Sequence, residues 1–373
     1  MKHFYFLLFL FFISFSFSQN IPTGYYNSAT GTGYTLKTQL KKIIDDVNDD
    51  LSNEYLSVDN GYSGLYTTYE TSDVDRYYEN DGTVLDMYSE KPNGPDDYEY
   101  TYAIETPDDR DSGSGGTSEG EFYNREHIIP QSVFDSNSPM RGDAHFVVPS
   151  DKYVNAQRGN LPYGVVQNAN YTSSNGSKRG NNLNSGYSSG YSGDVFEPIN
   201  EFKGDIARMY FYFVTRYEDQ LTSFNAYDMF NGSSNQAFNP TFFNILYQWH
   251  IQDPVSLREQ DRNDAIFAAQ NNRNPFIDHP EYVQSIWNNL LSAESYSKTD
   301  FKIYPNPVSG NVLYIKTNEN ITVQIFDVLG KSILTKQINS NQNKIDVSEL
   351  KQGLYLINLK TEKGSITKKI IRQ

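Results

Sequence analysis

The hydrophobic pattern of the 373-residue chain changes near residue 300, and this change constrains the fold more than any other feature of the sequence. Before residue 300, apolar residues recur at helical spacing in several segments, whereas the remaining residues form the short runs typical of strands. A chain of this length is also long enough to form two domains. The predicted fold class is therefore α+β, with a domain of helices and strands followed by a small all-β sandwich.

Helical spacing of apolar residues predicts four helices in the first domain. Thr35 is the expected N-cap of the first of them. In the second, Ile206, Met209 and Phe213 fall on one face, which predicts a buried stripe. The predicted helices cover residues 35–51, 203–221, 255–270 and 281–291.

Three other segments of the first domain lack this spacing. Residues 55–111 alternate Tyr-rich runs with Gly, Asn and Pro, which favours strands and loops over helices. The Gly- and Ser-rich residues 112–120 are predicted to form a flexible loop. Residues 168–193 are low in complexity, and we expect a mobile surface loop there.

After a polar boundary at residues 292–300, the pattern indicates at least five short strands in about 70 residues, as in a small β-sandwich. Gly330 is expected at a hairpin turn between two of these strands. The predicted strands cover residues 312–316, 322–326, 332–337, 353–359 and 365–371.

The N-terminus has the features of a secretory signal peptide. Lys2 is followed by an almost wholly apolar run that ends at Phe17, and Ser16-Phe17-Ser18 supplies a small-x-small cleavage site. The alternative, a membrane anchor, requires about 20 apolar residues and this run is shorter. We therefore expect residues 1–18 to be removed on export. No later run is long and apolar enough to span a bilayer, so no stable membrane insertion is predicted.

Cysteine is absent, and this narrows the chemistry. An exported chain without disulfides must be held by its packing, with bound metal as a further means. Thiolate zinc sites and cysteine nucleophiles are excluded. Histidine is also scarce, with five residues in all, so few imidazoles are available for acid–base work.

The charge of the chain is unusual for a protein that binds nucleic acid. The net charge is −15, and residues 1–300 hold 41 acidic against 20 basic residues, whereas residues 301–373 hold 5 against 11. A tight, nonspecific DNA binder is normally basic. We interpret the acidic run over residues 45–111 as a solvated surface. A calcium site built from some of its carboxylates is the alternative, and the sequence does not locate it.

The densest polar chemistry lies in three nearby segments, namely Tyr123-Asn124-Arg125-Glu126-His127-Ile128-Ile129-Pro130, Arg141-Gly142-Asp143-Ala144-His145-Phe146 and Asn155-Ala156-Gln157-Arg158-Gly159-Asn160. Cleavage of a phosphodiester needs a base for water, stabilisation of charge on the phosphate, and neutralisation of the leaving oxygen. One histidine and one hard cation held by oxygen ligands can supply all three.

The local pattern suggests how these residues meet. Glu126 and His127 are neighbours near a strand end, where both can border one cleft, and Pro130 marks the end of the strand. A helix is expected over residues 150–157, with Ser150 as its N-cap. On it Asp151, Asn155 and Arg158 share a face. A β-hairpin leading into this helix, with a metal between them, would bring Glu126 and Asn155 together.

Arg-Glu-His followed by Asp-x-His and Asn-x-x-Arg-x-Asn resembles the bacterial endonuclease I family of nonspecific nucleases, which carry a ββα-metal finger. The resemblance continues through Val195-Phe196-Glu197-Pro198, Trp249-His250 and Asn272-Arg273-Asn274-Pro275, and so covers nearly all of the first domain. It implies a ββα-metal nuclease domain with several helices at residues 19–297. Some relatives in this family contain disulfide bonds, whereas this chain has no cysteine.

The resemblance implies a role for each site residue. His127 would be the general base, with Glu126 and Asn155 as the protein ligands of Mg²⁺, which Mn²⁺ or Ca²⁺ could replace. Arg141 is the candidate for holding the cleaved phosphate. The remaining candidates are Asp143, His145 and Arg158 in supporting roles, and Arg208 and Arg273 as phosphate contacts. For Arg208 and Arg273, an ion pair with a carboxylate on a helix surface is an equal alternative. His250 and His279 are expected to be packing or surface residues.

The last fifth of the chain resembles the C-terminal sorting domain of proteins exported by the type IX secretion system. This implies a sorting domain at residues 298–373, a partner in the secretion machinery, and an extracellular or cell-surface location reached through the periplasm. The residues that carry the likeness are Tyr304-Pro305-Asn306-Pro307, Ile325-Phe326-Asp327-Val328-Leu329-Gly330-Lys331, Gly353-Leu354-Tyr355-Leu356 and the basic end at residues 368–372.

The expected activity is metal-dependent endonucleolytic hydrolysis of DNA, with RNA as a second substrate because the chemistry acts on water and needs no ribose 2′-OH. Two alternatives stay open at this point. One is a secreted binding or adhesion protein that keeps the fold without the activity. The other is a phosphodiesterase or phosphatase that uses the same metal chemistry on small substrates.

Overall fold

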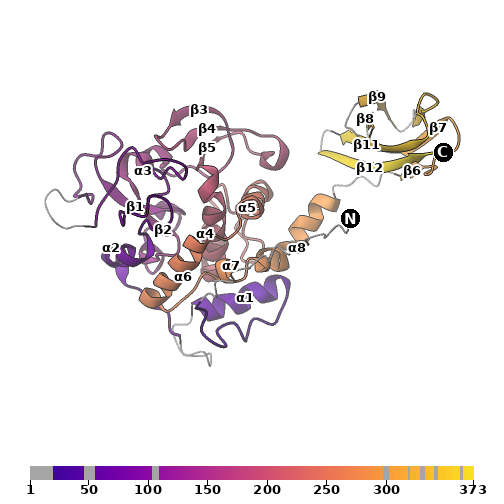
Figure 1. Ribbon diagram of the computed structural model, residues 1–373. Helices are drawn as coiled ribbons and strands as arrows, with labels where there is room; N and C mark the ends of the chain where they lie inside the picture. Colours follow the sequence, from indigo (N-terminus) through magenta and orange to yellow (C-terminus); the bar gives the residue numbers. More distant parts are fainter. Residues whose placement is uncertain are drawn as a thin grey trace, which may run out of the picture. The chain divides into compact units, whose positions relative to one another are not determined.

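The computed structural model describes residues 20–45, 55–102, 109–296, 302–317, 320–327, 332–339, 343–361 and 364–373. The predicted signal peptide and the turn at Gly330 lie outside these residues. The chain divides into two compact units, residues 1–287 and 288–373 (Figure 1). Within the described part of the chain, no helix is both long enough and apolar enough to cross a membrane.

The first unit is built mainly of helices. The predicted helices at residues 203–221, 255–270 and 281–291 are confirmed, with small shifts at their ends. α8 is kinked at Trp287, whose backbone is not helical (φ −103°, ψ 20°). The helices are α1 (Gly33–Ile44), α2 (Gly61–Ser72), α3 (Lys152–Arg158), α4 (Lys203–Arg216), α5 (Pro240–Gln252), α6 (Leu257–Gln270), α7 (Pro275–Asp278) and α8 (Glu281–Tyr296).

Helix α4 forms the centre of the first unit. Every residue from Gly204 to Arg216 is buried, so this helix is enclosed on all sides and not only along one stripe. Its aromatic residues explain the enclosure, since Phe211 packs against Phe238, Phe276 and Trp287. α1, α5 and α7 all pack against α4 (Figure 1). The core therefore forms around one Phe- and Tyr-rich helix.

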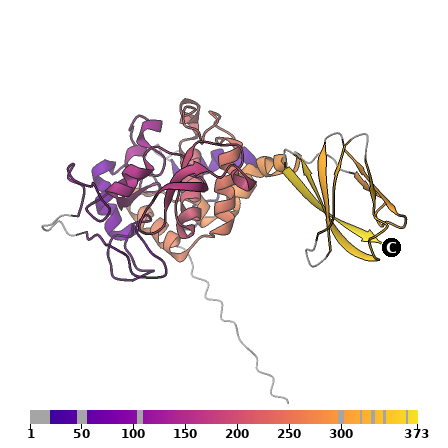
Figure 2. The same ribbon diagram turned by 90° about the horizontal axis from the view of Figure 1, so that it is seen from above.

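Two small sheets complete the first unit. β1 (Tyr123–His127) pairs antiparallel with β2 (Val147–Asp151), and the second sheet has the order β3 (Val166–Thr172), β4 (Lys178–Asn182), β5 (Asp194–Glu197). The magenta strands of the second sheet lie on one face of the unit, in front of the helices in Figure 2. The prediction of a mobile loop at residues 168–193 was therefore wrong, because polar strands paired there give no hydrophobic alternation to detect.

Two further predictions for the first unit need correction, and one helix was not predicted. Residues 55–111 were expected to lack helices, but α2 lies there and packs along α6. α1 begins at Gly33 with Thr32 in the N-cap position, so Thr35 lies inside the helix. Helix α5 was not predicted, although Pro240 at its first position is a common start signal.

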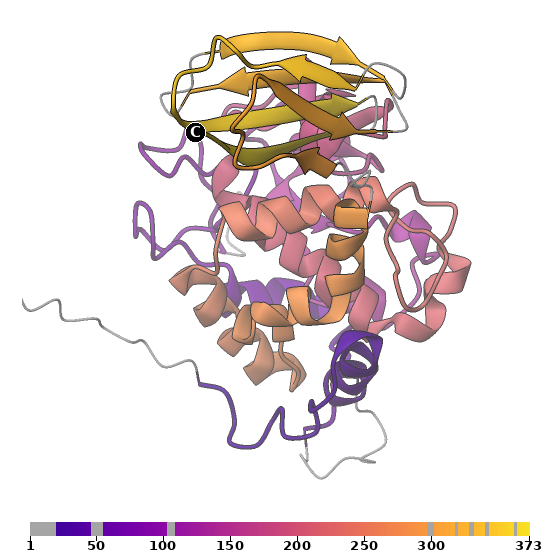
Figure 3. The same cartoon turned by 90° about the vertical axis from the view of Figure 1, so that its right-hand side faces the viewer.

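Helix α8 runs to Tyr296, past the boundary between the units, and the described residues of the second unit after it form an all-β domain, as expected. Its strands form two antiparallel sheets, β10-β7-β6 and β12-β11-β8-β9, seen in layers in Figure 3. Leu313 and Ile315 from one sheet and Val323, Ile325 and Ile357 from the other share one buried core. The strands are β6 (Lys302–Tyr304), β7 (Val312–Lys316), β8 (Ile321–Phe326), β9 (Ser332–Ile338), β10 (Lys344–Asp346), β11 (Gly353–Thr361) and β12 (Gly364–Arg372). The five predicted strands are confirmed, and β6 and β10 were not predicted.

Candidate active site

The candidate site is built on the β1–β2 hairpin and helix α3. In the hairpin, Glu126 is opposite Val148 and His127 is opposite Val147. α3 follows β2 directly, and Asp151 is its N-cap, accepting a hydrogen bond from the Val154 N–H at 2.8 Å. Ser150, the predicted N-cap, is instead paired with Asn124 within the strand. The expected strand, turn and helix are therefore present, one residue out of place at the cap.

Glu126 points into a buried polar cluster. It is 2% exposed, and its Oε1 accepts from the Tyr88 hydroxyl at 3.1 Å and the Tyr163 hydroxyl at 3.4 Å. The Arg158 Nη1 lies 3.3 Å from the same oxygen. Burial raises the pKa of Glu126 to about 7, although Arg158 and the two tyrosines favour the carboxylate. The backbone N–H of His127 is a further hydrogen-bond donor to this carboxylate.

Arg158 ties helix α3 to strand β1. Its guanidinium donates to the carbonyl oxygens of His127 at 2.9 Å and Ile128 at 2.6 Å, in addition to its contact with Glu126. The side chain is 1% exposed and lies 4.8 Å from the Tyr163 ring centroid. A buried cation in this place fixes the angle between strand and helix, and so fixes where Asn155 stands relative to Glu126.

His127 points away from Glu126, as successive residues of a strand do. Its Nε2 lies 3.1 Å from the carbonyl oxygen of Arg141. Because a carbonyl only accepts, Nε2 carries the ring proton and Nδ1 holds the free lone pair of the neutral imidazole. Burial, together with the charges of the nearby Arg125, Arg141 and Arg158, lowers the pKa of His127 to about 4, whereas the hydrogen bond to the Arg141 carbonyl acts in the opposite direction. His127 is therefore neutral at ordinary pH.

A cationic cluster lies beside His127. The Tyr62 ring, 5.8 Å from the His127 ring, has the Arg125 guanidinium carbon 3.5 Å from its centroid and that of Arg141 at 4.4 Å. Arg125 also donates to the Tyr62 carbonyl at 3.0 Å, and Arg141 Nε donates to Gln131 at 3.2 Å. Two arginines held on one aromatic ring form a local positive site in an acidic chain.

Asn155 lies on α3, which packs against β1 and β2. The helix is short, and its carbonyl at Asn155 accepts from Gly159, whose φ of +56° ends it. The Asn155 side chain is partly exposed and makes no hydrogen bond with the described residues. Its amide oxygen therefore has no hydrogen-bond donor among the described residues.

Asp143 and His145 lie in a second buried network behind the hairpin. Asp143 accepts from Arg216 at 2.8 Å, Tyr217 at 2.7 Å and Tyr212 at 3.0 Å. His145 is 1% exposed and its Nε2 lies 3.0 Å from the Asn272 carbonyl. These contacts connect the loop before β2 to α4 and to the segment before α7, an arrangement that favours the supporting roles expected for both residues.

Arg208 and Arg273 are both fully buried, which does not suit a phosphate contact. Arg208 pairs with both carboxylate oxygens of Glu259, at 2.5 and 2.7 Å, and Arg273 pairs with both of Asp278, at 2.7 and 2.9 Å. Arginines committed to buried carboxylates serve the packing of helices. The alternative of carboxylate pairing fits the structure, with the correction that both pairs are interior and not on a helix surface.

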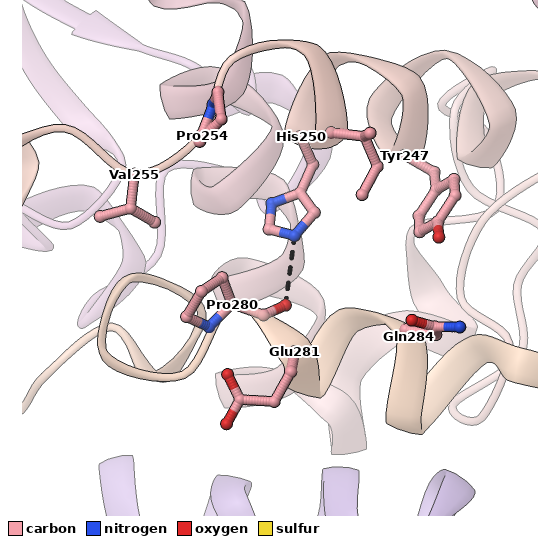
Figure 4. Close-up of a pocket in the computed structure, with 8 residues that line it drawn as sticks. Tyr247, His250, Pro254, Val255, Pro280, Glu281 and Gln284 are labelled. Carbon is pink, nitrogen blue, oxygen red and sulfur yellow. Dashed lines mark hydrogen bonds between the residues drawn. The ribbon is translucent and has the colours of Figure 1, made fainter.

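His250 takes part in the same interior packing. Its Nε2 lies 3.2 Å from the Pro280 carbonyl, and Arg208 contacts its Nδ1. Figure 4 shows the ring in a pocket also lined by Tyr247, Pro254 and Gln284. This pocket shares no residue with the hairpin site. His279, partly exposed, pairs with Glu281 at 3.1 Å, in keeping with a surface role.

Sequence reasoning missed three residues of the site. Tyr62 was hidden because α2 was not predicted, and Tyr88 lies in a loop with no pattern. Arg125 stands inside the quoted Arg-Glu-His motif, so its position could have been noticed, but only the structure shows it on the Tyr62 ring.

A hairpin followed by a helix, with a histidine and a carboxylate on neighbouring strand positions and arginines around them, defines a nuclease. The family model for endonuclease I matches residues 32–281, and the chain belongs to this family. Two extracellular ribonucleases are similar to it. That of Bacillus subtilis (strain 168) is 32% identical over 270 residues, covering 70% of this chain and 78% of the relative. That of Bacillus amyloliquefaciens is 32% identical over 269 residues, with the same coverage.

The second unit has relatives of its own. The family model of the secretion system C-terminal sorting domain matches residues 302–373. An endo-acting ulvan lyase of Formosa agariphila is 33% identical over 91 residues, which is 22% of this chain and 17% of that enzyme. The sorting domain and the extracellular relatives indicate an extracellular or cell-surface nuclease.

Proposed function

We propose that this nuclease cleaves phosphodiester bonds within DNA and RNA without strong sequence preference, using His127 as general base and one Mg²⁺ held by Glu126 and Asn155. The observation that carries the proposal is the state of His127. Its imidazole is neutral, with Nε2 fixed on the Arg141 carbonyl and Nδ1 left as a base, beside the arginines on Tyr62. A base next to a cationic site suits attack of water on a phosphate.

The two candidate ligands suit a hard divalent cation. The Glu126 carboxylate and the Asn155 amide oxygen are hard oxygen donors, and no thiolate competes for a softer metal. A bound Mg²⁺ would stabilise the charge that grows on the phosphate and on the leaving oxygen. Mn²⁺ or Ca²⁺ could occupy the same oxygen set.

The protein residues would divide the remaining work. Nδ1 of His127 takes the proton from the attacking water, and the fixed Nε2–H bond keeps the ring in the orientation for that step. Arg141, with Arg125 beside it, holds the phosphate by charge and hydrogen bonds. Arg158 holds Glu126 and the strand in place. Asp143 and His145 support the loop that carries Arg141 and β2.

The substrate class rests on the relatives and on the chemistry. Both similar Bacillus proteins are named extracellular ribonucleases, which supports RNA as a substrate. Because water is the nucleophile, the reaction needs no 2′-OH, which supports DNA as well. We further propose the domain limits 1–18, 19–297 and 298–373 for signal peptide, catalytic domain and sorting domain, with delivery by the type IX secretion machinery.

Incubation of the purified chain with plasmid DNA and with RNA, with Mg²⁺ or with EDTA, tests the proposal. Nicks at many positions, seen with Mg²⁺ and lost with EDTA, are expected. A protein that binds nucleic acid without cutting it under any metal would support the adhesion or binding alternative instead. Hydrolysis of small phosphodiesters alone would support the small-substrate alternative.

Removal of either proposed ligand is expected to weaken Mg²⁺ binding. Glu126→Ala and Asn155→Ala each take away one oxygen ligand, so half-maximal activity requires more Mg²⁺, and added Mg²⁺ restores part of the rate. A Mg²⁺ titration of plasmid cleavage measures this shift. Asn168→Ala, which removes an exposed amide in β3, serves as the matched control. Unchanged titrations for both ligand variants would show that the ligands are misassigned.

A further inference from the structure

Three carboxylates of the acidic run converge at one place in the loop after α2. One carboxylate oxygen from each of Asp75, Glu79 and Glu90 lies within 4.8 Å of the other two. Asp75 is 2% exposed and Glu90 is 1% exposed, whereas Glu79 is not buried. Two buried carboxylates and a third at the rim repel one another strongly in a medium of low dielectric constant. The arrangement therefore needs a positive partner.

The described residues supply no such partner. Lys91, the nearest basic residue in this segment after Glu90, pairs with Asp97 at 2.6 Å, and Arg76 donates to the Thr71 carbonyl. No described lysine or arginine forms an ion pair with Asp75, Glu79 or Glu90. The charge of the cluster is thus left to be balanced by a proton or by an ion.

Glu90 gives an independent indication that something is bound there. Its Oε1 is buried and has no hydrogen-bond partner in the described structure, although buried polar atoms are normally paired. Asp75, by contrast, is held rigidly, since it accepts the backbone N–H groups of Tyr77 at 3.0 Å, Tyr78 at 3.1 Å and Asn80 at 2.8 Å.

We propose that Asp75, Glu79 and Glu90 bind a structural Ca²⁺ ion. Three carboxylates are hard oxygen ligands, and Ca²⁺ completes a shell of about 6–8 oxygens with backbone carbonyls and water, tolerating irregular geometry. Mg²⁺ fits less well because it demands near-ideal octahedral geometry and keeps most of its water. This site goes beyond the proposed function and shares no residue with the hairpin.

Calcium binding at this site would stabilise the loop that contacts the catalytic hairpin and helix α3. Between Asp75 and Glu90 the chain carries Asp86, whose Oδ2 accepts the N–H of Asp151 at 2.7 Å, and Tyr88, which donates to Glu126. The Glu90 N–H in turn donates to the Asp86 carbonyl at 2.9 Å. An ion joining Asp75 to Glu90 closes this loop, so it stabilises the segment that holds the cap of α3 and the carboxylate of Glu126.

Thermal melting of the chain from Gln19 to Gln373, stripped with EDTA and titrated with CaCl₂ at constant MgCl₂, tests the proposal. The Glu126→Ala background weakens the proposed catalytic metal site, and the cluster variants described next assign the remaining calcium response. At a calcium concentration about 100 times the Kd, the melting temperature is expected to rise by roughly 5–10 °C. Isothermal titration calorimetry in the same background is expected to give one calcium site.

Two variants assign the response to the cluster. Glu79→Gln changes a residue that is not buried, folds safely, and is expected to weaken calcium binding by about tenfold or more. Glu90→Gln is expected to abolish the calcium response while melting no lower than the metal-free parent, because it removes an unpaired buried carboxylate. Glu70→Gln, an exposed change of equal charge on α2, is the control and is expected to titrate like the parent.

Two results would overturn the calcium site. One is the lack of any calcium response in the Glu126→Ala background. The other is a response that Glu79→Gln and Glu90→Gln both leave unchanged. Neither result bears on His127 or on cleavage, so failure here is distinguishable from failure of the proposed nuclease mechanism.

Discussion

Replacement of His127 by alanine is expected to lower the turnover of plasmid cleavage by about 10²–10⁴-fold, the usual contribution of a positioned acid–base group. The reason is local. Nδ1 is the free basic atom of a neutral ring whose other nitrogen is committed to the Arg141 carbonyl. Steady-state cleavage kinetics measure the loss, and thermal melts check that the fold survives.

The pH dependence separates the base from the metal ligand. At saturating Mg²⁺ the rate is expected to hold down toward pH 4, since His127 becomes cationic only near its lowered pKa. At limiting Mg²⁺ the rate is expected to fall already below pH 7. Glu126, with its pKa raised to about 7, must lose a proton before it binds the cation. Rate–pH profiles at both concentrations provide the measurement.

His145→Ala is the control for a purely structural effect. His145 is buried in the Asp143 network. Within the described part of the chain, it forms no hydrogen bond or ring contact with the two arginines on the Tyr62 ring. Its loss is expected to lower the melting temperature more than the turnover. A fully active His127→Ala protein would overturn the mechanism, whatever the family of the chain.

Removal of residues 301–373 is expected to abolish delivery to the outside while leaving cleavage intact. The second unit carries its own core and matches the sorting domain family, whereas all residues of the proposed site lie in the first unit. Cell fractionation with activity assays measures both effects, and the truncated protein is expected in the periplasm. An unrelated tail of equal length, fused in place of the sorting domain, is the control for length alone.

Two results would contradict this separation of sorting from catalysis. A truncated protein that still reaches the medium would show that the sorting signal lies in another part of the chain. A well-folded fragment of residues 20–297 that no longer cuts plasmid would show that the tail contributes to the chemistry or to the substrate site.

The sequence was sufficient where one local pattern decided the structure. Strand β1 ends at His127, three residues before the expected stop at Pro130, and α4 forms where the helical spacing of apolar residues predicts a helix. The five tail strands follow from alternation that the shared core of two sheets preserves. The family could also be identified, because its site residues are close together in the chain.

The remaining features depend on tertiary contacts that no local pattern encodes. α2 is rich in Gly, Thr and Tyr, and it is helical because Leu65, Thr68 and Tyr69 are buried, with α6 packed beside it. Strands β3 and β4 consist mostly of polar residues and are paired with each other, and the residues of β4 that are buried, Gly180 and Asn182, are not hydrophobic. The sequence identifies Arg208 as a basic residue. It does not reveal that this arginine forms a buried ion pair with Glu259, which is distant in the sequence.

The pair of arginines on Tyr62 lies in a chain whose net charge is −15, and this contrast governs how a nucleic acid approaches. At about 0.01 M ionic strength the repulsion between the acidic body and a polyanion extends roughly 30 Å, whereas at about 0.1 M it extends roughly 10 Å. The attraction at the partly buried arginines acts at contact and is screened less. The rate of encounter with nucleic acid is therefore expected to be lowest in dilute buffer and to increase as salt is first added, the reverse of what is expected of a basic nuclease. A secreted enzyme with this charge distribution is suited to salty surroundings.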